Sequence, residues 1–188
     1  DNLLANYVLP SVKNLNELNE YSRIENLNGI QYRVPKDAIF DGESKGTYQD
    51  IRHYKKGSII FSVSTTELAK NPYVQTFITD GHYNFNRELH TFWDIYRYHP
   101  TPDYINYSVV WNNNIPGLSI HSYEPYRDNH ILNFESYDGT YHFIYTIFYP
   151  KFLSADKVQK LRNMIEFFDS TNNPEFKLQQ HVVFPENR

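Results

Sequence analysis

The sequence contains no cysteine. This absence excludes disulfide bridges, zinc–thiolate sites, iron–sulfur clusters and thiol nucleophiles together. Only seven glycines occur in 188 residues, and they are dispersed along the chain. A G-x-G-x-x-G fingerprint and a Walker-type phosphate loop both need glycines close together, and neither motif occurs. Nucleotide hydrolysis through these motifs is therefore excluded.

Long apolar runs and basic clusters are also missing. No run approaches the roughly 20 apolar residues of a membrane-spanning helix, so we predict no transmembrane segment in this chain. Lysine and arginine are scattered and the net charge is −4, which excludes the basic face that a nucleic-acid partner needs. The chain begins at Asp1, which fits a removed leader and leaves open a lipid anchor upstream. We expect an extracytoplasmic, periplasmic or envelope location, with a cytoplasmic one as the alternative.

The sequence is instead rich in aromatic residues, at 17%, and in alternating apolar patterns. Apolar residues at helical spacing predict a helix within residues 11–20 and a longer one over residues 154–170, with Ser154 as its N-cap. The pair Asn28-Gly29 predicts the turn of a hairpin over residues 21–35. A loop is expected at residues 41–46 and a second hairpin at 47–66. Four strands follow, at residues 104–112, 118–126, 130–137 and 140–150.

These elements predict an α+β fold, because hairpins rather than β-α-β units dominate. We expect an antiparallel β-sheet of about six strands, flanked by amphipathic helices and with a C-terminal helix. We divide the chain into an N-terminal helical segment at residues 1–20 and a single α+β domain at residues 21–170. Residues 171–188 form a C-terminal tail or an edge strand.

The stretch DGHYNFNRELHTFWDIYRYH (80–99) carries three histidines and suggests two interpretations. On a helix, its apolar residues occupy a sector of roughly 100°, and the polar residues face the other way. This favours an amphipathic helix with a solvated face. The alternative is a metal site, which needs three or four converging ligands. Its candidate ligands are His82, His90, Asp94 and His99.

Two further patterns concern binding and catalysis. Ser119 and His121 share one face of a predicted strand, but the G-x-S-x-G motif of a nucleophile elbow is absent. The more informative feature is the surplus of tyrosine in the strand-rich half. Tyrosine combines a rigid apolar surface with a polar tip, which suits recognition, although it also simply fills strands well. The candidate binding residues are Tyr107, Trp111, Tyr123, Tyr126, Tyr137 and Tyr141.

The segment NIPGLSIHSYEPYRDNHILNFESYDGTYHFIYTIFYPKFLSADKVQKLRNMIEFF resembles the end of PsbP-like domains, the family that includes DcrB-type lipoproteins. It places a glycine before a strand, a Gly-Thr-Tyr entry into a tyrosine-rich strand, and a helix that ends in an aromatic pair. The resemblance extends over about 150 residues as a pattern of elements. It implies an antiparallel sheet between helices, binding to other proteins and an envelope location. It implies no catalytic residue.

The leading hypothesis is a non-enzymatic protein-binding or adaptor domain, exported or envelope-associated, that uses its aromatic-rich sheet surface. Its expected partner is another protein, and no cofactor is expected. One alternative is a metal-binding protein or metal-dependent hydrolase that uses the 80–99 stretch. A second alternative is a small-molecule carrier with an apolar pocket. Enzymatic activity is the less favoured class, because no catalytic motif was found.

Overall fold

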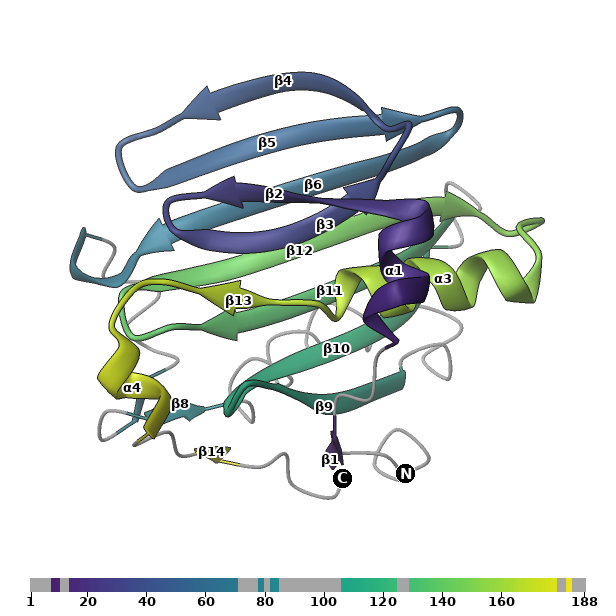
Figure 1. Cartoon of the computed structure of the whole chain (residues 1–188). Coiled ribbons are helices and arrows are strands. Elements are labelled where there is room, and N and C mark those ends of the chain that lie inside the picture. The colour runs from purple at the N-terminus through teal and green to yellow at the C-terminus, as the bar shows by residue number, and fades with distance from the viewer. Residues whose placement is uncertain are drawn as a thin grey trace.

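A computed structural model describes residues 8–10, 14–70, 78–79, 82–84, 106–124, 129–178 and 182–183. Antiparallel sheet dominates these residues, as the sequence predicts (Figure 1). None of the helices in these ranges is long and apolar enough to cross a membrane. The predicted residues His90, Asp94, His99 and Tyr126 lie outside the described ranges.

Within the described residues, the main sheet has eight strands rather than about six. All neighbouring strands are antiparallel except the first two, which are parallel. Both predicted hairpins and all four later strands are present. In spatial order the strands are β1 (Val8–Pro10), β9 (Asn106–Asn112), β10 (Ile115–Glu124), β11 (Asn129–Tyr137), β12 (Tyr141–Pro150), β6 (Ile59–Glu67), β5 (Gln49–Lys56) and β4 (Ile39–Lys45).

Strand β4 corrects one prediction, because residues 41–46 were expected to form a loop. Asp41 and Gly42 have the composition of a turn, but here they lie in a bulged strand. The pairing of β4 with β5 shifts by one residue between Phe40 and Glu43, and Gly42 has a φ of +118°. A glycine in such a conformation commonly marks a bulge, which accounts for the strand continuing through a turn-like sequence.

A second layer covers one face of the main sheet (Figure 1). It contains a three-stranded sheet of β2 (Ser22–Leu27), β3 (Ile30–Pro35) and β13 (Asp169–Ser170). Helices α1 (Leu15–Tyr21) and α3 (Ala155–Ile165) lie in the same layer, and α3 contacts β3, β11 and β12. The sequence predicted helices on the sheet but no second sheet.

The predicted helix over residues 154–170 ends early, at Ile165. Its N-cap is Ser154, as expected, and the Ser154 side chain accepts a hydrogen bond from the Lys157 amide. Phe168 continues the apolar spacing of the helix but lies beyond its end, buried against Phe134 and Phe143. The chain then pairs with β3 as β13, so tertiary packing overrides the helical pattern here.

The remaining described elements are short. Hairpin β2–β3 turns at Asn28-Gly29, where both residues have positive φ, as expected for this turn type. The C-terminal region expected as a tail or edge strand contains a helix and a short strand. The short elements are η2 (Leu68–Lys70), α4 (Pro174–Leu178) and a small sheet of β7 (Ile78–Thr79), β8 (His82–Asn84) and β14 (Val182–Val183).

The core lies between the two layers and is built on aromatic rings. Tyr145 of β12 is fully buried, and its hydroxyl donates a hydrogen bond of 2.7 Å to the carbonyl oxygen of Arg33 in β3. Tyr32 makes edge-on ring contacts with Tyr145 and Tyr54, and the Tyr32 and Tyr54 hydroxyls lie 2.6 Å apart. The hydroxyls of Tyr145, Tyr32 and Tyr54 therefore each have a partner, which avoids the cost of an unpaired polar group at these positions.

Candidate functional site

The predicted aromatic residues do not share one surface. Directly paired residues of antiparallel strands lie on the same face of the sheet. Tyr123 pairs with His130, which pairs with the core residue Tyr149, so Tyr123 lies on the face toward the second layer. Tyr141 alternates with Tyr145 on β12 and lies on that face too.

The other described members of the set lie on the opposite face. Tyr137 pairs with His142, which lies on the face opposite to that of its neighbour Tyr141. On β9, Tyr107 and Trp111 are four residues apart and share one face. Tyr107 and Tyr137 are only 5% and 6% exposed. Trp111 is half-buried. Tyr107 and Tyr137 are therefore packed inside the protein and offer little surface for contact with a partner.

The structure describes His82 of the predicted metal ligands, and places it in β8 opposite Thr79. The other three, His90, Asp94 and His99, lie outside the described residues. Within the residues described, no group of three histidine, aspartate or glutamate side chains has a geometry suited to a metal ion.

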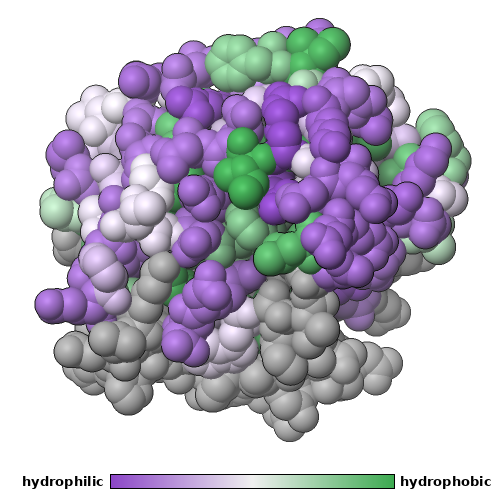
Figure 2. Space-filling model, in the orientation of Figure 1, coloured by the Kyte–Doolittle hydropathy of each residue, from purple (hydrophilic) through white to green (hydrophobic). Residues whose placement is uncertain are grey.

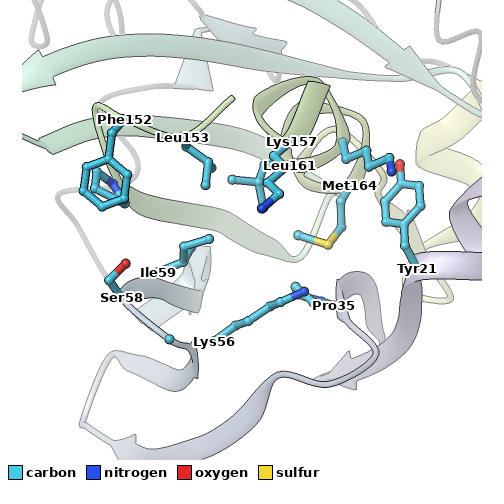
Figure 3. A pocket seen from close by; sticks show the side chains of 13 residues that line it. Tyr21, Pro35, Lys56, Ser58, Ile59, Phe152, Leu153, Lys157, Leu161 and Met164 are labelled. Carbon is cyan, nitrogen blue, oxygen red and sulfur yellow. The ribbon is translucent and has the colours of Figure 1, made fainter. Parts of the chain in front are cut away.

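A hollow with a mainly apolar lining lies beside α3: it is a groove with a volume of about 490 Å³. The groove lies between α3, the β12–α3 loop, the β5–β6 turn and the end of β3. Figure 3 shows Ile59, Leu153 and Met164 pointing into the same space. Residues from five separate segments line it: Tyr21, Pro35, Lys56, Gly57, Ser58, Ile59, Pro150, Phe152, Leu153, Lys157, Lys160, Leu161 and Met164.

Helix α3 positions one wall of the groove. Its buried residues Leu161, Met164 and Ile165 pack against the core and hold the helix in place beside the groove. The β12–α3 loop then brings Phe152 to the groove, where its side chain is 81% exposed. Such exposure is unusual for a large aromatic side chain, and marks a candidate contact residue.

The charged residues that line the groove are all lysines, and one of them, Lys160, pairs at 3.6 Å with Asp156 just outside the lining. Lys56, Lys157 and Lys160 contribute to the lining, and the described lining includes no acidic side chain. Lys56 pairs at 3.1 Å with Asp37, and its ammonium group lowers the pKa of the Asp37 carboxyl. The Lys160 ammonium lies 5.7 Å from the ring centre of Tyr21. The groove thus combines an apolar floor with a cationic border.

The rest of the surface on this face of the molecule offers weaker candidates for a binding site. Figure 2 shows a mainly hydrophilic face on which apolar side chains form small, separate groups, one of them over β4. Ile39 and Phe40 of β4 are 61% and 53% exposed. Small isolated groups of this kind are normal on protein surfaces, whereas the groove joins apolar residues from several segments.

A second cluster lies on the inner face of the main sheet. We name His121, His130 and Tyr149 the histidine–tyrosine cluster. The Nε2 atom of His121 lies 3.1 Å from Nδ1 of His130 and 2.9 Å from the hydroxyl oxygen of Tyr149. The rings of His130 and Tyr149 are stacked, with an interplanar angle of 12°. Three polar side chains from three neighbouring strands therefore meet at one point.

Burial controls protonation in this cluster. Burial, followed by repulsion from His130 and Arg162, lowers the pKa of His121 to about 4, so its imidazole is neutral near pH 7. Burial also raises the pKa of Tyr149 to about 12, so its phenol is protonated at that pH. His121 and Tyr149 are consequently both uncharged near pH 7, and the hydrogen bond between them joins two neutral groups.

Ser119 and His121 share a face of β10, as predicted, but do not act as a pair. The Ser119 hydroxyl donates a hydrogen bond of 2.6 Å to the carboxylate of Glu166, just beyond α3. His121 is engaged with His130 and Tyr149 instead. The contacts of Ser119 accordingly give no basis for nucleophilic catalysis.

Neither site was found from the sequence. The groove combines residues that are distant along the chain, and the only local signal was Phe152, an apolar residue in a loop beside Lys151. The histidine–tyrosine cluster depends on the pairing of three strands, which the sequence does not specify. The alternation of residues along the predicted strand placed His121 on one face with Ser119, but it did not identify the side chains that contact His121.

Comparison with known proteins identifies no relative of this chain: no protein-family model matches the sequence, and no curated protein gives a significant match.

Proposed function

We propose that the chain is a non-enzymatic binding domain that holds an apolar segment of a protein partner, flanked by acidic residues, in the groove beside α3. The observation that carries this proposal is the combination of an apolar floor with Lys56, Lys157 and Lys160 at the border. Apolar side chains of the partner would gain from leaving water, and the lysines favour nearby carboxylates.

The shape of the groove supports a protein partner over an enclosed small molecule. Phe152 projects from the loop with 81% of its side chain exposed, so a partner that covers it must extend beyond the groove. Aromatic side chains in such positions often dominate binding energy once a partner buries them. The aromatic sheet surface predicted from the sequence is a weaker location, because Tyr107 and Tyr137 are buried.

The resemblance to PsbP-like domains supports the same class of function and an envelope-associated location. It rests on the pattern of elements between Asn114 and Phe168, in which Gly117 precedes the strand predicted at residues 118–126 and Gly139-Thr140-Tyr141 enters another. The proposed site does not depend on this resemblance. Fractionation of cells that express the full-length protein, followed by immunodetection, tests the location by itself.

The experiment that tests the groove is a selection of short random peptides on the immobilised protein, followed by affinity measurements on a Phe152→Ser variant. Phe152 is exposed, so this substitution leaves the core intact. Selected peptides should share apolar residues flanked by Asp or Glu. Their affinity, measured by fluorescence anisotropy, should fall about tenfold in Phe152→Ser, the usual effect of removing an aromatic anchor. Lys157→Glu should also weaken binding, and added salt should reduce the difference.

Two matched controls test whether the effects belong to the groove. Ile39→Ser removes an exposed apolar side chain on β4, and Lys45→Glu reverses a charge on the same strand. Both should bind the peptides like the unmodified protein. Failure to select peptides, or peptides whose binding ignores Phe152 and Lys157, would overturn the proposal.

A small-molecule carrier remains the second candidate, because the groove volume of about 490 Å³ falls within the usual range for ligand sites. Dodecanoate, an apolar chain with one carboxylate, is a suitable probe for this function. Saturable dodecanoate binding that Lys157→Glu abolishes, together with failed peptide selection, would favour the carrier over the protein-binding domain.

A further inference from the structure

We propose that His121, His130 and Tyr149 form a binding site for a borderline divalent cation, Cu²⁺ or Zn²⁺. This site shares no residue with the groove or with the 80–99 histidine stretch. Imidazole nitrogen is a preferred donor for both ions, and a phenolate oxygen provides a third, anionic donor. The proposal rests on the convergence of three donor atoms on one side of the sheet.

The distances between donors suit a shared cation. Nε2 of His121 lies 3.1 Å from Nδ1 of His130 and 2.9 Å from the Tyr149 oxygen. In a tetrahedral site with metal–ligand bonds of about 2.0–2.1 Å, neighbouring donors lie roughly 3.3 Å apart. Separation of the side chains by a few tenths of an ångström would replace the two hydrogen bonds with metal bonds.

The strands hold these side chains in place before any cation binds. His130 on β11 pairs directly with Tyr149 on β12. His121 lies two residues from Tyr123, the partner of His130 on β10, and therefore faces the same side. All three side chains start from paired backbone of a continuous antiparallel sheet. Sites on such regular elements keep their geometry better than sites on loops.

The protonation chemistry of the cluster also fits a cation. A histidine ligand must be neutral, and burial keeps His121 in this form near pH 7. Tyr149 must lose its proton: the metal–oxygen bond forms as the O–H bond breaks, and the proton leaves to solvent. Binding should therefore release a proton. Three protein donors leave a further coordination position for water.

One nearby charge opposes the cation. Arg162 on α3 is close enough to lower the pKa of His121. Its guanidinium lies 3.8 Å from the carboxylate of Glu166, which offsets part of this charge. The phenolate formed at Tyr149 offsets more of it once the ion binds. The site therefore suits an ion that binds imidazole strongly, and Cu²⁺ should bind more tightly than Zn²⁺.

The test uses the full chain without a histidine tag, titrated with Cu²⁺ and separately with Zn²⁺ against a competing chelator. We expect one cation per chain and, with Cu²⁺, a visible charge-transfer band from the phenolate. Calorimetry with Zn²⁺ in two buffers of different ionisation enthalpy counts the released proton. Tyr149→Phe should abolish the band and the proton release while keeping the ring packing. His130→Ala should weaken binding more than tenfold, since the loss of outer-shell partners alone costs about that much.

Two other histidine variants locate the site. His53→Ala removes a histidine on β5, away from the cluster, and should leave affinity unchanged. His90→Ala tests the stretch at residues 80–99. The proposal is overturned if no cation binds, or if Tyr149→Phe and His130→Ala both bind like the unmodified protein. Binding that is lost only in His90→Ala would also overturn it, and would place the ion in that stretch.

Discussion

The ring of Phe134 occupies the space above Gly117, so a Cβ atom added to Gly117 would lie 2.1 Å from Cζ of Phe134. The two residues are diagonal neighbours on adjacent strands, because Gly117 pairs with Ser136 and Phe134 pairs with Ser119. Phe134 is fully buried and also contacts Phe143 and Phe168. Glycine at position 117 is thus what allows this aromatic core to close.

Substitution Gly117→Ala should lower the free energy of unfolding by about 1–3 kcal/mol, the range for overpacking a tight core. Urea denaturation measures the change. The double variant Gly117→Ala/Phe134→Leu should lose less than the sum of the two single variants, because the smaller leucine makes room for the new methyl group. Strict additivity would mean that the two residues do not compete for space.

The buried tyrosines should make the fold labile at high pH. Burial raises the pKa of Tyr32, Tyr54 and Tyr145 above the ordinary value of 10. Above pH 10 the unfolded chain loses these protons and the folded chain keeps them. Their contribution to stability is therefore complete below pH 10 and is lost as pH rises. Each such tyrosine removes about 1.4 kcal/mol of unfolding free energy per pH unit.

Urea denaturation at a series of pH values between 9 and 11 checks this slope. In Tyr145→Phe, the free energy of unfolding should fall less steeply with pH above pH 10. The difference in slope should correspond to about one proton, whatever the absolute stability of the variant. The control is Tyr48→Phe, at an exposed position. A free energy of unfolding that stays constant from pH 10 to pH 11 would contradict the prediction.

Asp138 should be among the most sensitive polar positions. Its side chain is 1% exposed and accepts hydrogen bonds from the amides of Thr140 and Tyr141, the Ser170 hydroxyl and the Asn172 amide group. Asp138→Ala removes this acceptor and should cost about 3 kcal/mol, because several buried donors lose their partner. Thermal and urea unfolding measure the loss. Asp41→Ala, at an exposed aspartate on β4, should cost far less.

The N-cap of α3 should connect stability with the groove. Ser154→Ala should lower the free energy of unfolding by about 1 kcal/mol, the usual cost of losing a capping hydroxyl. It should also weaken peptide binding, because Lys157 lies in the first turn of the helix. Hydrogen exchange of the amides at the start of α3 should rise. Unchanged exchange together with unchanged stability would contradict a capping role.

Local signals predicted the hairpins of both layers well. Asn28-Gly29 encodes its turn through positive φ at both residues, and β12 shows the expected alternation. The face of β12 that carries Tyr145 is buried from Phe143 to Tyr149, whereas Ile144 and Phe148 on the other face are half-buried. These features depend on neighbours in the sequence, so the sequence alone suffices to locate them.

Features that depend on distant pairing were missed. Phe168 continues the apolar spacing of α3 and was assigned to the helix, although its partner Phe134 draws it into the core after the helix ends. The meeting of His121 with His130 and Tyr149 follows from strand register, which no local pattern specifies. Most of the aromatic surplus among described residues is likewise interior packing, as with Tyr32 and Tyr145.

Strand β4 is the last strand on its side of the main sheet, as far as the described residues extend, and it carries the exposed side chains of Ile39 and Phe40. A flat, apolar strand in this position is a template onto which another chain can add by backbone pairing. The bulge at Gly42 breaks the regular spacing of hydrogen-bonding groups that an incoming strand would need. Charged residues then follow, with Glu43 paired to Arg52. Removal of Gly42 would restore the regular spacing of backbone hydrogen-bonding groups along β4. A second copy of the chain could then pair with this edge.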